Sequence, residues 1–129
     1  MRLPKDLEAL IEEEAKRTRR SKGAVVEALA SEAIKARLFP GIAFRGDDWD
    51  RRAWLIGTAL DIWQIVDAHR DFGSVERMVD ESDLSERQLR LGLAYYARFP
   101  DEIDAMIERN HAPLNELRAR FPMIDVIST

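Results

Sequence analysis

The sequence predicts a mainly helical protein with one small β-hairpin. Apolar residues recur every three or four positions along most of the chain, which is the period of amphipathic helices. Proline and glycine stand where these segments start or end, at Pro4, Gly41, Gly73 and Pro100. Residues 42–56 differ, because two short apolar runs there flank a polar turn, as in a hairpin.

Residues 1–38 predict two helices joined by a basic turn. Pro4 suits the start of the first helix, and Ser21 is a suitable N-cap for the second. The apolar positions of the two helices are Leu7, Leu10, Ile11, Ala15, Val25, Val26, Leu29, Ala33, Ile34 and Leu38. Two helices of this length have no core of their own, so we expect a partner, most simply a second copy of the chain.

Residues 39–110 predict the hairpin followed by several short helices. The runs 42–45 and 52–56 form the hairpin, and a helix of about a dozen residues follows Thr58 and ends at Gly73. A short helix then starts at the N-cap Ser74. These elements form the second predicted domain.

The next helix, over residues 85–99, presents one apolar face. Its inward residues are expected to be Leu89, Leu93, Tyr96 and Phe99. Pro100 starts a last helix, which the segment 111–113, with Pro113 at its end, is expected to break. The remaining tail, residues 111–129, ends in a strand-like apolar run.

Composition limits the class of protein. The 129 residues are 34% charged and 46% hydrophobic, which is ordinary for a folded soluble domain. No apolar run approaches the roughly 18 residues of a membrane span, and the Glu-rich N-terminus is unlike a signal peptide. The absence of Cys excludes disulfides and thiolate metal sites. We therefore expect a cytoplasmic protein.

Charge is unevenly distributed along the chain. The net charge is −4, but residues 1–38 carry nine Lys and Arg against seven Asp and Glu, whereas residues 39–129 are strongly acidic. Five basic residues fall within seven positions: Lys16, Arg17, Arg19, Arg20 and Lys22. Local positive potential of this kind suits a phosphate partner. The alternative is a solvated turn between two helices.

With the Arg2-Leu3-Pro4 opening and Arg20-Ser21 at the start of the second helix, residues 1–38 resemble the ribbon-helix-helix family of Arc, MetJ and CopG. The resemblance implies an intertwined dimer, in which each chain gives a short N-terminal strand to a ribbon in the DNA major groove. It implies that Arg2 reads base edges and that the second helix start, at Ser21 and Lys22, binds phosphate. The implied DNA-binding residues are Arg2, Arg19, Arg20, Ser21 and Lys22.

Two positions depart from the pattern of this family. Only Met1 precedes Arg2, so either the ribbon is short or the native start lies upstream. Thr18-Arg19 occupies a turn where the family often has Gly with positive φ, which carries a conformational cost. The alternative for residues 1–38 is an ordinary helical hairpin that serves only dimerisation.

A second resemblance covers residues 41 to about 105. The matching segments, in order, are 41–45, 51–55, 57–63, 73–76, 89–96 and 100–104. They resemble a family of small bacterial helix-turn-helix domains often found as antitoxins beside PIN-type toxins. Residues 74–99 have helix-turn-helix proportions.

If this domain binds DNA, four residues line the start of its recognition helix: Ser85, Arg87, Gln88 and Arg90. Glu81, Asp83 and Glu86 place negative charge at the same end, which phosphates would oppose. We therefore favour this domain as a scaffold for dimerisation or toxin contact over a direct DNA contact.

The tail, residues 111–129, is the expected contact with a protein partner. The families above imply a PIN ribonuclease, whose active site is a carboxylate cluster holding divalent metal. Tail arginines would pair with these carboxylates while apolar residues anchor beside them. The expected toxin-binding residues are Leu117, Arg118, Arg120, Phe121 and Ile124. The alternative is a tail that packs onto the second domain and stabilises a dimer.

Other residues give no sign of catalysis or metal binding. Asp47, Asp48 and Asp50 lack the Gly and the distal Glu of a calcium loop, so we expect a solvated turn. His69 and His111 suggest neither a metal pair nor a catalytic dyad. No Gly-rich phosphate loop or activated nucleophile is present. We expect no enzyme activity, metal or cofactor.

These expectations combine in one hypothesis: a dimeric antitoxin of a type II toxin–antitoxin system. It would bind double-stranded operator DNA as an autorepressor and neutralise a cognate PIN-type toxin. Two alternatives stay open, a stand-alone transcriptional regulator without a toxin and an oligomerisation module that does not bind DNA.

Overall fold

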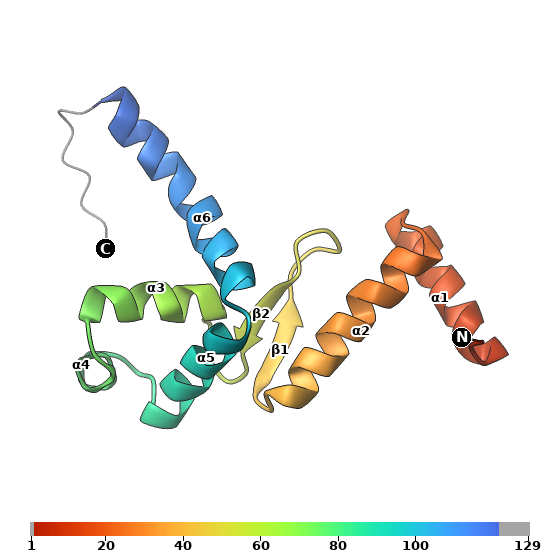
Figure 1. The fold of residues 1–129 in the computed structure, drawn as a ribbon, viewed down its shortest axis with the longest axis horizontal. Helices are drawn as coiled ribbons and strands as arrows, with labels where there is room; N and C mark the ends of the chain where they lie inside the picture. Colours follow the sequence, from red (N-terminus) through yellow and green to blue (C-terminus); the bar gives the residue numbers. More distant parts are fainter. Residues whose placement is uncertain (1, 122–129) are drawn as a thin grey trace. The chain divides into compact units, whose positions relative to one another are not determined.

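The computed structural model describes residues 2–121, and these are mainly helical with one small antiparallel hairpin, as expected (Figure 1). The elements are α1 (Lys5–Thr18), α2 (Lys22–Leu38), β1 (Ile42–Arg45), β2 (Arg52–Leu55), α3 (Ile62–Phe72), α4 (Val75–Glu81), α5 (Glu86–Arg98) and α6 (Pro100–Arg120). No helix within residues 2–121 combines the length and apolarity that a membrane crossing needs. The chain divides into two compact units, residues 1–57 and 58–129.

Helices α1 and α2 pair through a very small core. Ile11 and Ala15 of α1 bury against Val25 of α2, with Leu3 and Val26 partly buried beside them. Residues 2–4 lie in no strand of the single chain. A ribbon strand forms only between two chains in an intertwined dimer, so the short N-terminal strand stays a prediction.

Most of the apolar side chains predicted to form one broad face of α2 are exposed, and they do not share a face, because Leu29 and Leu38 lie about 180° apart around the helix. Ser21 caps the helix as expected, because its Oγ accepts the N–H of Ala24 at 3.1 Å. Of the α2 side chains only Val25 is buried, whereas Leu29, Ile34 and Leu38 are 44%, 59% and 54% exposed. A single chain therefore leaves about three large apolar side chains of this helix in water, which is unfavourable unless another surface covers them.

The hairpin belongs to the same compact unit as α1 and α2. Strands β1 and β2 pair antiparallel, with Ile42 opposite Leu55 and Arg45 opposite Arg52. Ile42 and Leu55 are buried, and β1 packs beside α2. The unit boundary therefore lies after Gly57, whereas the sequence placed a domain boundary after Leu38.

In the second unit, helices α4, α5 and α6 pack against α3. Both ends of α3 are capped, by a reciprocal Asp61–Gln64 capping box and by Gly73 in the left-handed conformation. The buried hydrophobic side chains contributed by the four helices are Ile62, Ile65, Val66, Met78, Leu89, Tyr95, Ile103 and Ile107. Gly92 lets α5 approach α3 closely, because a Cβ there would lie 3.2 Å from Ile65 Cγ2.

Two expectations for the second unit were wrong. The innermost aromatic residue of α5 is Tyr95, with Tyr96 only half-buried, because the buried stripe runs through Leu89, Gly92 and Tyr95. Helix α6 also continues through Pro113 to Arg120. Proline removes one backbone donor, but its φ is compatible with a helix, and good helix formers such as Leu, Glu, Arg and Ala follow it.

Candidate nucleic-acid interface

The basic turn, residues 16–22, joins α1 to α2 through a Schellman motif. The N–H of Arg20 donates to the Ala15 carbonyl at 3.0 Å, and the N–H of Arg19 donates to the Lys16 carbonyl at 3.4 Å. Arg19 has a φ of 55°, a left-handed conformation that usually belongs to Gly. This confirms the strained turn expected at Thr18-Arg19. The side chains of Lys16 and Arg19 are exposed.

The predicted phosphate-binding residue Lys22 lines a groove that the predicted base-reading residue Arg2 does not line. Leu3, which follows the exposed Arg2, lines an apolar groove of about 360 Å³ together with Lys22. The Lys22 ammonium lies 3.4 Å from carboxylate oxygens of both Glu8 and Glu12. The hydrogen bond to Glu8, and to a smaller extent the one to Glu12, raises the pKa of Lys22. Its charge is therefore already compensated by α1.

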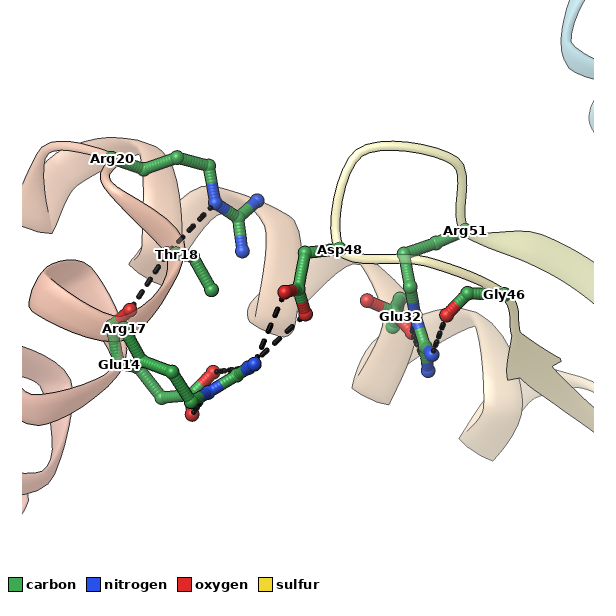
Figure 2. Close-up of polar contacts among 8 residues, drawn as sticks. All are labelled: Glu14, Arg17, Thr18, Arg20, Glu32, Gly46, Asp48 and Arg51. Carbon is green, nitrogen blue, oxygen red and sulfur yellow. Dashed lines mark hydrogen bonds and ion pairs between the residues drawn. The ribbon is translucent and has the colours of Figure 1, made fainter.

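Arg17, which the sequence placed in the basic patch but not among the DNA-binding residues, has the most extensive contacts of the turn. Its guanidinium donates two bonds of 2.8 Å to Glu14 and two of 3.1 Å to Asp48 (Figure 2). The hydrogen bonds from Arg17 lower the pKa of both carboxyl groups. One arginine is thus shared between a helix neighbour and a residue of the hairpin.

Arg20 also contacts the hairpin. Its Nε donates to Thr18 Oγ1 at 3.2 Å, and its guanidinium carbon lies 5.3 Å from the centroid of the Trp49 ring. A guanidinium at this distance is attracted by the ring electrons. Trp49 itself is 71% exposed. The hairpin loop, residues 46–51, therefore holds two arginines of the basic turn.

Arg51 fixes the conformation of the hairpin loop. It donates to the Gly46 carbonyl at 3.0 Å and to the Glu32 carboxylate at 3.0 and 3.2 Å (Figure 2). It also donates to the Phe44 carbonyl at 3.0 Å. Asp48 and Arg51 line a small cleft of about 190 Å³ that also includes Arg17. Sequence reasoning did not anticipate this network, because Arg17 and Asp48 are 31 positions apart.

The four residues predicted at the start of a recognition helix are largely used within α5. Ser85 Oγ accepts the N–H of Gln88 at 3.1 Å, and Gln88 Oε1 accepts the N–H of Ser85 at 2.9 Å. Arg90 pairs with Glu86 at 2.8 Å, and Arg87 is exposed. These contacts stabilise the helix start and involve three of the four side chains, all but Arg87.

The predicted toxin-binding residues lie at the end of α6. Leu117, Arg118, Arg120 and Phe121 are all exposed, whereas Ile124 lies outside the described residues. The first half of α6 is instead held to α3 and α5 by polar contacts. These are Arg70 to Asp104 at 3.0 Å, Tyr96 to Asp104 at 2.8 Å, Tyr95 to Glu102 at 2.7 Å and His111 to Asp67 at 2.8 Å.

Two of the three acidic hairpin residues form ion pairs, Asp48 with Arg17 and Asp50 with Arg52, and Asp47 is exposed. Across residues 2–121, no three His, Asp or Glu side chains converge so that they could hold a metal ion. Comparison with protein-family models, with curated proteins and with solved structures finds no match to this chain.

Proposed function

We propose that this chain is a cytoplasmic, dimeric DNA-binding protein and the antitoxin of a type II toxin–antitoxin system. Residues 1–38 bind operator DNA as a ribbon-helix-helix dimer, and α6 with the tail binds a PIN-type ribonuclease. Binding of both partners by one chain couples repression to the amount of toxin. The observation that carries this proposal is a basic turn followed by a capped helix start, in two helices that leave several large apolar side chains exposed.

Exposed apolar side chains of α1 and α2 support dimerisation. Ile34 and Leu38 are more than half exposed, and Leu10 of α1 is 58% exposed. The core shared by α1 and α2 contains only three buried residues, Ile11, Ala15 and Val25. A second copy of this unit would extend that core by covering some of these exposed side chains.

The start of α2 supports phosphate binding. The exposed Lys16 lies in the last turn of α1, and the exposed Arg19 lies three positions before the start of α2 at Lys22. The first N–H groups of any helix have no intrahelical partner, and the helix dipole favours an anion there. Ser21 already caps one of these groups, at Ala24.

DNA binding is tested by titrating the full chain with the duplex upstream of its own gene and with a random duplex, between about 50 and 200 mM salt. The informative variant is Arg19→Gly. Because Gly relieves the left-handed strain, this variant should be more stable by about 0.5–1 kcal/mol. It should nevertheless bind the operator about tenfold more weakly, with a shallower salt dependence. Weaker binding cannot then be attributed to unfolding.

The control is Arg37→Ala, which removes the same charge from an exposed position near the other end of α2. It should leave operator affinity within about twofold of the wild type, apart from long-range charge effects. Equal losses of operator affinity in Arg19→Gly and Arg37→Ala would mean that binding depends only on the net charge of the chain. If the chain binds the upstream and random duplexes equally well, the proposed role as a repressor is excluded.

The proposed binding of a toxin is tested by removing residues 113–129. This truncation keeps the polar contact of His111 with Asp67. Operator affinity should be unchanged, because the shortened chain retains the whole first unit. Neutralisation of a ribonuclease encoded beside the gene should be lost, since the exposed Leu117 and Phe121 are removed. If the shortened chain still neutralises the nuclease, the partner surface lies elsewhere.

A second candidate function is an oligomerisation module that does not bind DNA. The charge pairing of Lys22 with Glu8 and Glu12, and of Arg17 with Glu14 and Asp48, favours it, because these cations are already compensated. In that case the chain would form a stable dimer in solution and bind random and upstream duplexes equally weakly.

A further inference from the structure

The hairpin loop contacts the same turn that we propose for DNA binding. Asp48 accepts two hydrogen bonds from Arg17, and the Trp49 ring lies against the Arg20 guanidinium. Both contacts come from consecutive residues of the loop, and both reach arginines of the basic turn (Figure 2 shows the first). All of these residues belong to one compact unit, residues 1–57.

The chemistry of the Arg17–Asp48 contact is the chemistry of phosphate recognition. A guanidinium donates two parallel hydrogen bonds to a carboxylate and does the same to a phosphate. With Glu14 and Asp48 both in place, Arg17, Arg20 and these two carboxylates are neutral together, so this part of the turn attracts a nucleic-acid backbone only weakly. Without Asp48, Arg17 and Glu14 are neutral together, and the neighbouring Arg20 adds a positive charge.

We propose that the hairpin loop is an intramolecular competitor for DNA, in which the Asp48 carboxylate occupies the place of a backbone phosphate at Arg17. This proposal rests on the DNA-binding function proposed above. Binding of a duplex displaces Asp48 and makes Arg17 a phosphate contact. Because DNA must first displace Asp48, the apparent affinity of the basic turn for DNA is lowered. Binding to weak, non-specific DNA sites is therefore disfavoured.

The ion pair between Arg17 and Asp48 is well positioned but weak. Arg51 positions the loop through the Gly46 and Phe44 carbonyls and through Glu32, so Asp48 is held near Arg17. The side chains of Arg17 and Asp48 are nevertheless 56% and 40% exposed. Exposed ion pairs are weak and screened by salt, so a polyanion can replace the carboxylate without unfolding α1.

The test is a comparison of Asp48→Asn with Asp47→Asn in the full-length chain. Both substitutions remove one negative charge from the loop, but only Asp48 bonds to Arg17, whereas Asp47 is exposed. Binding to a labelled duplex from upstream of the gene is measured by fluorescence anisotropy over a salt series. Asp48→Asn should bind about three- to tenfold more tightly than Asp47→Asn, with a logarithmic salt slope steeper by about one.

A second substitution shows whether the gain comes from Arg17. Adding Arg17→Ala to Asp48→Asn should abolish the gain, as a coupled pair requires. A gain that persists without Arg17 would overturn the competitor proposal, as would equal affinities of Asp48→Asn and Asp47→Asn. In both of these cases the wild type still binds DNA and the proposed function stands. If neither the wild type nor any variant binds the duplex, DNA binding itself fails, and the competitor proposal fails with it.

Discussion

Replacement of Tyr95 by Ala should lower the free energy of unfolding by about 3–5 kcal/mol, the largest stability effect that we expect in this chain. The Tyr95 side chain is 0% exposed, and its ring centroid lies 4.9 Å from that of Phe99. Truncation to Ala leaves a cavity in the middle of the second unit, because the surrounding helices relax only partly. Urea denaturation followed by circular dichroism measures the effect.

The matched control is Tyr95→Phe, which keeps the ring and removes only the hydroxyl. That hydroxyl donates to Glu102 Oε2 at 2.7 Å, and burial raises the pKa of Tyr95, so it remains a donor at neutral pH. Loss of one such bond should cost about 1 kcal/mol. If Tyr95→Ala costs no more than Tyr95→Phe, the ring does not form the centre of this core.

Replacement of Gly46 by Ala should destabilise the first unit by about 2–4 kcal/mol, through backbone strain and steric overlap together. Gly46 has a φ of 115°, and a Cβ there would lie 2.2 Å from the Asp50 carbonyl oxygen. Backbone atoms cannot move away as a flexible side chain can, so the hairpin loop must rearrange. Thermal and urea denaturation of the full chain measure the loss.

Gly57→Ala separates the two contributions to this effect. Gly57 also has a positive φ, 89°, but no atom lies within 4 Å of a Cβ placed there. Its replacement should therefore show the backbone strain alone, about 1 kcal/mol. Equal effects at Gly46 and Gly57 would mean that the hairpin loop accommodates a Cβ easily.

Local signals predicted several of the helix ends. Ser21 and Ser74 cap α2 and α4, and Gly73 ends α3 in the left-handed conformation. A cap is formed by side chains and N–H groups within three or four residues, so a short stretch of sequence contains all of its chemistry. The strained turn at Arg19 was predictable for the same reason.

The hydrophobic periodicity was less reliable in deciding which of two adjacent aromatic residues is buried. Tyr95 and Tyr96 differ by only about 100° around a helix, and both fit an apolar face. Contacts with other helices decide between them, since Tyr95 packs beside Phe99 and bonds to Glu102 of α6. Pro113 misled in a different way, because a proline lowers helix stability without always ending the helix.

The sequence by itself determined the mainly helical class, the caps, the hairpin and the basic turn at residues 16–22, since each depends on neighbours in the chain. Only the tertiary structure decided that the hairpin joins the unit of α1 and α2, and that Asp48 and Trp49 hold Arg17 and Arg20. Those contacts join residues about 30 positions apart. Their formation depends on how β1 packs against α2, which local patterns do not specify.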